Sequence, residues 1–386
     1  MESDSSPNWN AFREQMPVTR NWAYFDHAAV APLCQPAVEA MREWIDDIAT
    51  HGDAHWSRWR DHVEKIRNVC AHLLNADEDE IAFIRNTTEG INIVAEGFPW
   101  KPRDNIVLPA GEFPTNLYPW LNLEDRGVKT RMVPVENERL DLNQLESTCD
   151  ERTRLIALSW VGYATGWRND LEAVAEIAHR KGALLFVDAI QGLGVFPLDV
   201  SQVPVDFLAA DGHKWLLGPE GAGVFFMRKE HLHMLRPVGV GWNSVVNAGD
   251  FSQTELRLKP TASRYEGGSH AMPGLLGFGA AVRMILRYGV SAISKRLVEV
   301  TDTLCERLPD LNAEIISCRN QDRKSGIVSF TIPKVKAPTI RSVCREHNVI
   351  VNCRAGRVRL SPHCYTNEDD VNQLMFALKT ALQETE

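Results

Sequence analysis

The sequence predicts an α/β protein in which a mostly parallel sheet lies between layers of helices, with a smaller α+β unit after it. Two observations support this prediction. From about residue 80 to residue 230, short apolar runs alternate with helical patterns, which is typical of strand–helix–strand units and a parallel sheet. After about residue 270 the pattern changes to helices followed by a few strands. A chain of 386 residues can form two or three such units.

The central sheet is predicted from runs that are apolar at almost every position, as in strands covered by helices on both faces. Between two of these runs, Leu171, Val174, Ala175 and Ala178 form one face of a helix, and Gly182 follows as a stop signal. The predicted strands cover residues 105–110, 154–160, 183–189, 205–211 and 221–228.

The C-terminal part is expected to form a compact α+β subdomain. Its predicted helices cover residues 274–289, 291–308 and 339–348, with a closing amphipathic helix from residue 367. Its predicted strands cover residues 326–333 and 357–363. We therefore expect an N-terminal segment of undecided packing (residues 1–50), a large α/β domain (residues 51–270) and a small α+β domain (residues 271–386).

The composition is that of a soluble globular protein, with 44% hydrophobic and 24% charged residues. The net charge is 42 − 51 = −9, which disfavours binding to nucleic acids or anionic membranes. We see no secretory signal and no apolar run of the roughly 20 residues that a membrane span needs. Eight scattered cysteines without a Cys-x-x-Cys pair indicate a reducing cytoplasm. His51 and His55, without a third ligand recognised beside them, are expected to be ordinary polar residues, and no metal site is predicted.

Four chemically capable side chains follow two of the predicted strands. Asp188 ends one strand and Gln191 comes three residues later, while His213 and Lys214 follow the next strand. Ligands of open α/β sheets bind beyond the carboxyl ends of the strands, and a buried lysine is costly unless it is paired or neutralised. Pyridoxal phosphate (PLP) uses such a set, because it bonds a lysine and needs an acid beside its ring nitrogen.

These motifs resemble a known family. The pattern Asp-x-x-Gln, then His-Lys, then GPxGxG is similar to that of the class V aminotransferase and cysteine desulfurase group, fold type I of the PLP enzymes. The resemblance covers about residues 24–371 and implies a seven-stranded-type, mostly parallel sheet. It implies that Lys214 forms the Schiff base and carries the substrate α-proton, and that Asp188 pairs with the pyridinium nitrogen. Gln191 would bond the ring hydroxyl, and His213 would contact the phosphate or the ring.

The resemblance extends to further cofactor-binding residues. Thr87 and Thr88 match the phosphate-binding turn, where the start of a helix offers free N–H groups to an anion. Phe113 would stack on the ring at a place where desulfurases carry a histidine, and Tyr163 would lie near the ring. Ser269 would reach the cofactor of a partner subunit, which implies a homodimer with shared active sites.

Two arginines match the segment that binds the substrate carboxylate, Arg359 better than Arg354. An arginine fork suits this task because it can form two parallel hydrogen bonds. One departure concerns Asp211, which stands where desulfurases usually have a phosphate-binding serine. A carboxylate would repel a phosphate, so we expect Asp211 to turn away, toward His213 or a backbone N–H.

The sequence therefore predicts a cytoplasmic, homodimeric PLP enzyme that acts on an amino acid or amine. Phe113 and the short C-terminal segment favour an aminotransferase or isopenicillin-N-epimerase-like enzyme. The alternative is a C–S lyase or cysteine desulfurase-like enzyme, and an alternative of another class is a non-catalytic binding module with this fold. A desulfurase of the usual kind is disfavoured because the loop between Arg354 and Arg359 that would carry its cysteine is missing; Cys353 and Cys364 are expected to be structural.

Overall fold

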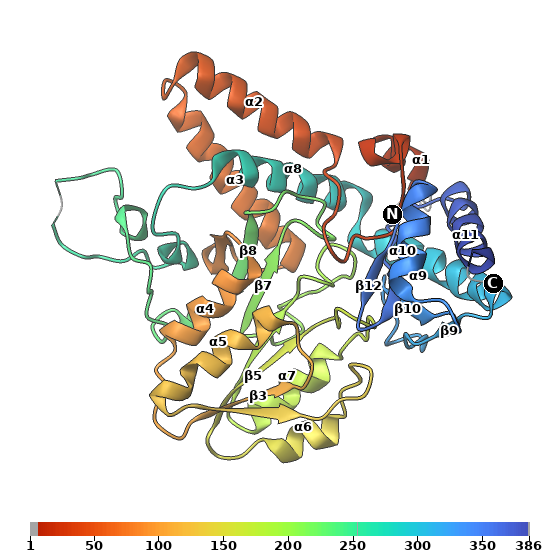
Figure 1. Cartoon of the computed structure of the whole chain (residues 1–386). Coiled ribbons are helices and arrows are strands. Elements are labelled where there is room, and N and C mark those ends of the chain that lie inside the picture. The colour runs from red at the N-terminus through yellow and green to blue at the C-terminus, as the bar shows by residue number, and fades with distance from the viewer. Residues whose placement is uncertain (1–6, 253, 385–386) are drawn as a thin grey trace, which may run out of the picture.

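A seven-stranded sheet forms the centre of the computed structural model, which describes residues 7–252 and 254–384 (Figure 1). The strand order is β2-β8-β7-β6-β5-β3-β4. All neighbouring pairs from β7 to β4 are parallel, and β8 is antiparallel to both of its neighbours. The strands are β2 (Ile81–Ile84), β3 (Asn105–Pro109), β4 (Lys129–Val133), β5 (Thr153–Ser159), β6 (Leu184–Asp188), β7 (Phe207–Asp211) and β8 (Gly223–Met227).

The five predicted strands correspond to β3, β5, β6, β7 and β8, so the mostly parallel sheet is confirmed. Alternate residues of these strands belong to two separate cores, which is why the runs read as apolar at every position. On one face, the core includes helices α3 (Trp56–Leu74), α7 (Leu171–Arg180) and α8 (Met272–Tyr288); on the other it includes α4 (Thr87–Gly97) and α5 (Tyr118–Leu121). Strand β4 is not among the predicted strands, because it is a half-exposed edge strand of mostly polar residues.

The helices of the large α/β part are α2 (Gln35–His51), α3 (Trp56–Leu74), α4 (Thr87–Gly97), α5 (Tyr118–Leu121), α6 (Leu142–Thr148) and α7 (Leu171–Arg180). Helix α4 approaches the sheet closely at Gly90, where a Cβ atom would lie 2.5 Å from the Cβ of Ala209 on β7. This contact fixes the start of α4 beside the carboxyl end of β7.

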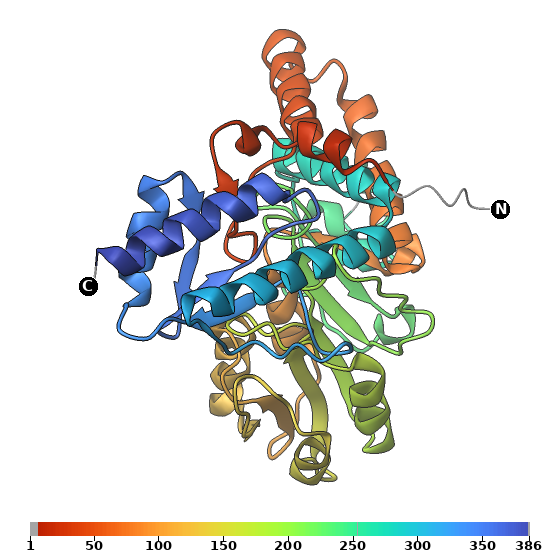
Figure 2. The ribbon, with the colours of Figure 1, turned by 90° about the vertical axis from the view of Figure 1, so that its right-hand side faces the viewer.

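The C-terminal part forms a third core beside the large sheet (Figures 1 and 2). Its four-stranded sheet has the order β12-β13-β10-β9. The strands are β9 (Glu314–Ile315), β10 (Val328–Thr331), β12 (Asn352–Arg354) and β13 (Arg357–Leu360), and the helices of this half are α8 (Met272–Tyr288), α9 (Val290–Arg307), α10 (Ala337–Glu346) and α11 (Glu368–Gln383). Helix α8 itself packs mainly against α2 and α3. The domain division near residue 270 stays a prediction.

The N-terminal segment, whose packing the sequence left undecided, joins the C-terminal part. Strand β1 (Ala23–Tyr24) pairs in parallel with β11 (Val349–Ile350). Helix α1 (Trp9–Glu14) carries Arg13, whose guanidinium bonds the carboxylate of Asp370 at the start of α11. Figure 2 shows the first turns of the chain beside the C-terminal helices.

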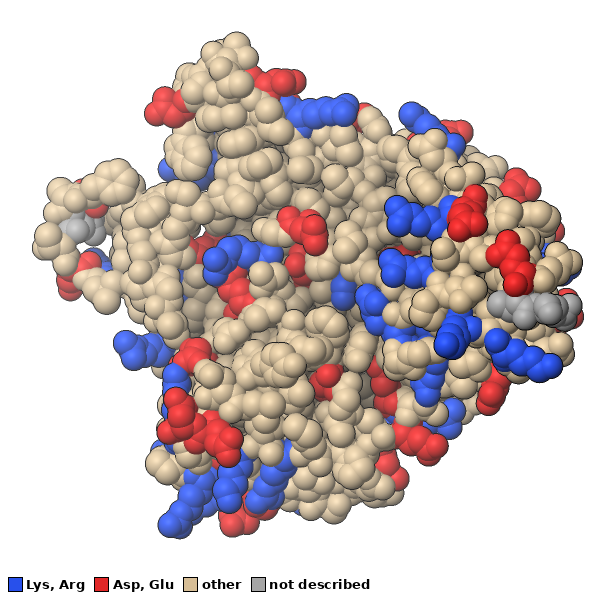
Figure 3. All heavy atoms as spheres, in the orientation of Figure 1, with Lys and Arg blue, Asp and Glu red and all other residues tan. Residues whose placement is uncertain are grey.

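Within the described residues, no single helix is long and apolar enough to cross a membrane; α8 and α9 satisfy the length and composition only together, and they meet at a bend of 81°. On the face shown in Figure 3, Lys and Arg side chains are interspersed with Asp and Glu side chains and form no continuous basic area.

Candidate active site

A cavity of about 520 Å³ opens at the carboxyl ends of β5, β6 and β7. Parallel strands bring their carboxyl ends to one edge of a sheet, so residues distant in sequence meet there. Of the residues predicted from the sequence, all but Ser269 line this cavity: Thr87, Thr88, Phe113, Tyr163, Asp188, Gln191, Asp211, His213, Lys214, Arg354 and Arg359. Their functional roles stay predictions, but the structure brings them to one place.

Lys214 points into this cavity from the turn after β7. Burial disfavours the ammonium form and lowers its pKa to about 8, although the nearby Asp188 carboxylate partly offsets this effect. Its Nζ lies 5.7 Å from the centroid of the Phe113 ring. The side chain is therefore neither a surface lysine nor a closed structural ion pair, and it offers a readily deprotonated amine to a ligand.

Asp188 ends β6, directly beside β7 in the sheet. It is 3% exposed, and burial raises its pKa to about 6, while a hydrogen bond from the Ile190 N–H and the charge of Lys214 act in the other direction. At neutral pH the carboxylate still carries its charge, because this pKa lies below 7. A buried carboxylate in this position would favour a cationic ligand group.

Gln191 is held by two hydrogen bonds that fix the direction of its amide. Its Nε2 donates to the Ala28 carbonyl at 3.0 Å, and its Oε1 accepts from Trp215 Nε1 at 2.8 Å. The amide nitrogen has a second N–H that these contacts do not use. Trp215 directly follows Lys214, so this pair also ties the lysine turn to the strand β6 side of the cavity.

Asp211 departs from the family pattern, and its surroundings agree with the expected turn toward His213. The Asp211 Oδ2 and His213 Nδ1 atoms lie 3.0 Å apart. The backbone N–H of Asp211 donates to Thr87 Oγ1 at 3.1 Å, and Oδ1 has no hydrogen-bond partner. The contact with Thr87 links the end of β7 to the first turn of α4.

The start of α4 faces the cavity, as the sequence predicts. Asn86 caps the helix, accepting a hydrogen bond from the Glu89 N–H at 2.9 Å. Thr88 Oγ1 lies 3.1 Å from Thr115 Oγ1. The first N–H groups of this 11-residue helix and the hydroxyls of Thr87 and Thr88 therefore form an anion-compatible wall of the cavity.

Phe113 and Tyr163 form the aromatic wall, with ring centroids 5.2 Å apart in an edge-to-face arrangement. Beside them lies a carboxyl group that the sequence did not reveal. Glu112 accepts hydrogen bonds from the N–H and Oγ of Ser159, a cavity-lining residue at the end of β5. Burial, with a smaller contribution from Asp188, raises the pKa of Glu112 to about 7. Its only sequence signal is its place directly before Phe113.

The two predicted carboxylate-binding arginines stand on neighbouring strands of one hairpin. Strands β12 and β13 are joined by Ala355 and Gly356 alone, both with positive φ, so the loop expected for a desulfurase cysteine is absent. Arg359 is 1% exposed; it donates to the Tyr163 carbonyl at 2.7 Å and to Asp26 Oδ1 at 3.3 Å. Its Nε has no hydrogen-bond partner.

Asp26 is a second residue that the sequence did not single out. Besides Arg359, it accepts a hydrogen bond from Asn352 Nδ2 at 2.6 Å. These contacts join the N-terminal segment to the arginine hairpin, across 333 positions of the chain. Asp26 therefore orients Arg359. The stretch "YFDHAA" (residues 24–29), where the resemblance to the family begins, is the sequence signal that could have indicated Asp26.

None of the eight cysteines, all within the described residues, lines the cavity. Cys364 is fully buried, and burial raises the pKa of its thiol well above the ordinary value. Cys353 is half-buried, and burial raises its thiol pKa as well. Neither thiol is disposed to act as a nucleophile, because the thiolate is the reactive form.

Ser269 lies outside this cavity. It is exposed and lines an adjoining cavity of about 640 Å³ that shares Arg85 and Gly221 with the first one. Its predicted contact with a partner subunit's phosphate stays a prediction.

The chain matches the family described as aminotransferase class-V over residues 23–374. A probable cysteine desulfurase of Methanothermobacter thermautotrophicus is 30% identical over 385 residues, covering 94% of this chain and 95% of its own. The apo structure of a cysteine desulfurase from Thermococcus onnurineus superimposes with a TM-score of 0.89 at 27% identity, covering both chains fully.

A third relative is C-DES. One structure is described as a complex of the cystine C–S lyase C-DES with its product cysteine persulfide; it has a TM-score of 0.88 at 25% identity and covers 94% of this chain and 99% of its own. A lysine-to-alanine variant of C-DES, with glycine covalently linked to its PLP, has a TM-score of 0.89 at 25% identity and covers 96% and 99%. Together with the topology, these likenesses confirm the predicted α/β fold of the PLP enzymes.

Proposed function

Because the chain belongs to the class V aminotransferase family, we propose that it is a PLP-dependent C–S lyase that acts on a sulfur-containing amino acid without a cysteine nucleophile of its own. One observation carries this proposal. The cavity joins Lys214, Asp188 and two arginines, and no cysteine lines it. The names of the relatives, cysteine desulfurases and a cystine C–S lyase, support C–S bond chemistry over the aminotransferase or epimerase-like activity expected from the sequence.

The residues of the cavity fit PLP. A buried amine with a pKa of about 8 can bond the cofactor aldehyde, and the carboxylate of Asp188 suits a protonated ring nitrogen. The start of α4, with Thr87 and Thr88, suits the phosphate, and the Phe113 ring offers an apolar face. When bound, PLP supplies an electron sink for negative charge that develops at the substrate α-carbon.

The chain's own residues then divide the work. Arg359, held by Asp26 and the Tyr163 carbonyl, and Arg354 bind the substrate carboxylate. Lys214 takes the proton from the α-carbon, because its amine is neutral in a useful fraction of molecules near neutral pH. The sulfur group leaves the β-carbon with the electron pair of the C–S bond and takes up a proton. No thiol of the chain accepts the sulfur.

Product analysis separates this activity from desulfuration. The PLP-loaded protein is incubated with cysteine and, separately, with cystine, and pyruvate, alanine, sulfide, persulfide and inverted amino acid are measured together. We expect the wild type to release pyruvate together with sulfide or a free persulfide. No persulfide should form on the protein thiols, and the variant Lys214→Ala should give no product. Cys353→Ser and Cys364→Ser should keep the wild-type rate. Alanine release that either serine variant abolishes would contradict the proposal and support a desulfurase.

A transaminase or epimerase-like activity is the second candidate. Phe113 favours it, because a phenyl ring at this wall can stack on the cofactor but cannot transfer a proton. In the same incubations this candidate predicts keto acid from substrates without sulfur, or inverted stereochemistry, and little sulfide.

The proposed enzyme is cytoplasmic and works on a small amino acid as a homodimer with shared active sites. The exposed position of Ser269 beside a cavity that adjoins the active site supports the dimer. Several large apolar side chains are exposed in the chain between β8 and α8: Val238, Val240, Trp242, Phe251 and Leu256. If active sites are shared, Lys214→Ala and Ser269→Ala subunits should regain activity when mixed, and a monomer in light scattering would contradict the dimer.

A further inference from the structure

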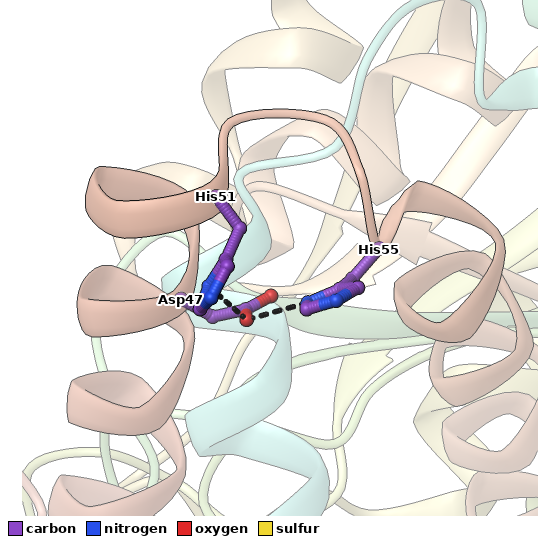
Figure 4. Close-up of side chains that lie close together, drawn as sticks. All are labelled: Asp47, His51 and His55. Atoms are coloured by element: carbon purple, nitrogen blue, oxygen red, sulfur yellow. Dashed lines mark hydrogen bonds and ion pairs between the residues drawn. The ribbon is translucent and has the colours of Figure 1, made fainter.

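The turn between α2 and α3 gathers three side chains of types that bind metals, and none of them lines the active-site cavity (Figure 4). Asp47 lies one helical turn before His51, the last residue of α2. Gly52, with φ of +59°, ends the helix, and the chain returns so that His55 directly precedes α3 at its N-cap position. From the sequence, the two histidines alone predict ordinary polar residues, but Asp47 supplies the carboxylate that such a pair lacks.

The ligand atoms of these three side chains lie within 4.8 Å of one another. Asp47 Oδ1 lies 3.2 Å from His51 Nδ1 and 2.7 Å from His55 Nδ1, and the two imidazole centroids are 4.8 Å apart. Ligand atoms bound to one tetrahedral Zn²⁺ at about 2.0–2.1 Å lie roughly 3.3 Å from one another. The distance from His51 Nδ1 to Asp47 Oδ1 already meets this spacing, whereas His55 Nδ1, which is hydrogen-bonded to the same oxygen, must move away from it by about half an ångström in an exposed turn.

The carboxylate is oriented for this task. Its second oxygen, Oδ2, accepts a hydrogen bond from the buried Trp59 Nε1 at 2.6 Å, which leaves Oδ1 directed at the histidines. Such outer contacts orient metal ligands and tune their affinity. The nearby cation Arg58 is engaged elsewhere, with Glu43 and over the Trp59 ring. The histidines are half-exposed, so water can complete the coordination.

A second group of similar residue types does not share these properties. Asp206 is 3% exposed, and its two oxygens separately accept hydrogen bonds from His231 and His179, with the Leu185 N–H as a third donor. The two histidines bond different oxygens of a buried carboxylate and do not converge on one oxygen, so this group is a closed hydrogen-bond cluster.

We propose that Asp47, His51 and His55 bind one Zn²⁺ ion, with water at the open position, and that the ion clips the end of α2 to the start of α3. Two imidazoles and a carboxylate favour a borderline transition metal over Mg²⁺ or Ca²⁺, which prefer oxygen ligands.

The test is a titration of the PLP-loaded protein with Zn²⁺, and with Co²⁺ as a spectroscopic probe. We expect one site that Asp47→Asn or His55→Gln weakens at least tenfold, with loss of the visible Co²⁺ bands. Trp59→Phe, which keeps all three ligands, should weaken the site about tenfold. His72→Gln removes an exposed histidine of the same helix outside the cluster and should bind normally.

The double variant His51→Gln/His55→Gln, which lacks both histidine ligands, provides a second and independent test in case a single variant misfolds. Zn²⁺ should raise the melting temperature of the wild type and of His72→Gln, but not that of the double variant. Zn²⁺ binding that persists unchanged in Asp47→Asn and His55→Gln would assign the ion to other groups and overturn the proposal. Absence of binding at equimolar micromolar concentrations would overturn it as well.

Discussion

Lys214 should capture PLP with a pH dependence that its surroundings set. The amine attacks only when neutral, and its pKa of about 8 makes about a tenth of the molecules neutral at pH 7. An ordinary lysine with a pKa near 10.5 would be neutral in about one molecule in three thousand. Burial in the cavity therefore raises the reactive fraction roughly 300-fold. Asp188 acts in the opposite sense, because its negative charge stabilises the ammonium.

The variant Asp188→Asn separates these two effects. It removes the charge that raises the Lys214 pKa but keeps the side-chain shape. In the wild-type apoprotein, the rate of covalent PLP capture should rise with pH to a half-maximum near 8. In Asp188→Asn the half-maximum should move to lower pH, while turnover falls by orders of magnitude because the ring nitrogen loses its acid partner.

Capture can be followed by absorbance and confirmed by borohydride reduction and peptide mapping, with Lys214→Ala as the blank. A half-maximum near 10.5 in the wild type would refute the argument from burial. A shift to higher pH in Asp188→Asn would refute the assigned role of the Asp188 charge. Near-normal turnover of that variant would show that Asp188 serves only the local backbone, through its bond to the Ile190 N–H.

Three further predictions concern separate parts of the molecule. Arg359→Lys should raise KM for amino acids at least tenfold, because one ammonium cannot replace a fork, and should spare amines without a carboxylate; equal losses for both would contradict carboxylate binding. Phe113→Ala should weaken PLP retention about tenfold, as expected for the loss of an aromatic contact, measured by dialysis; unchanged retention would exclude stacking. Glu266→Gln should cost about 3–5 kcal/mol in urea unfolding at pH 7, because it leaves the buried Arg67 with the exposed Glu64 as its remaining ion-pair partner. Ion pairing with Arg67 and a hydrogen bond from His270 hold the Glu266 pKa at about 2. The stability that the Glu266 carboxylate contributes to the fold is therefore present above pH 4.5 and is lost as the pH falls toward 2. A loss of less than 1 kcal/mol in the free energy of unfolding of Glu266→Gln would contradict this.

Local sequence determined the centre of the fold. Strands such as β6 and β7 are recognisable because both faces are buried, which demands apolar residues at every position. Asp188 and Lys214 were predicted to meet for a related reason. They follow parallel strands, and parallel strands end at the same edge of a sheet. Thr87 and Thr88 were predicted to line the site because helix starts have local signatures, and they do line the cavity at the start of α4.

Only the tertiary structure decided which remote segments complete the site. Asp26 and Arg359 lie 333 positions apart, and no local pattern relates them. The same holds for β1 and β11, whose pairing places the N-terminal segment. Asp47 lies within one turn of His51 in the sequence, yet its significance emerges only because Gly52 turns the chain and Trp59 fixes the carboxylate. Helical and strand periodicity follow from short-range backbone geometry. These contacts depend instead on how the helices and strands pack against one another, and one sequence pattern is compatible with many packing arrangements.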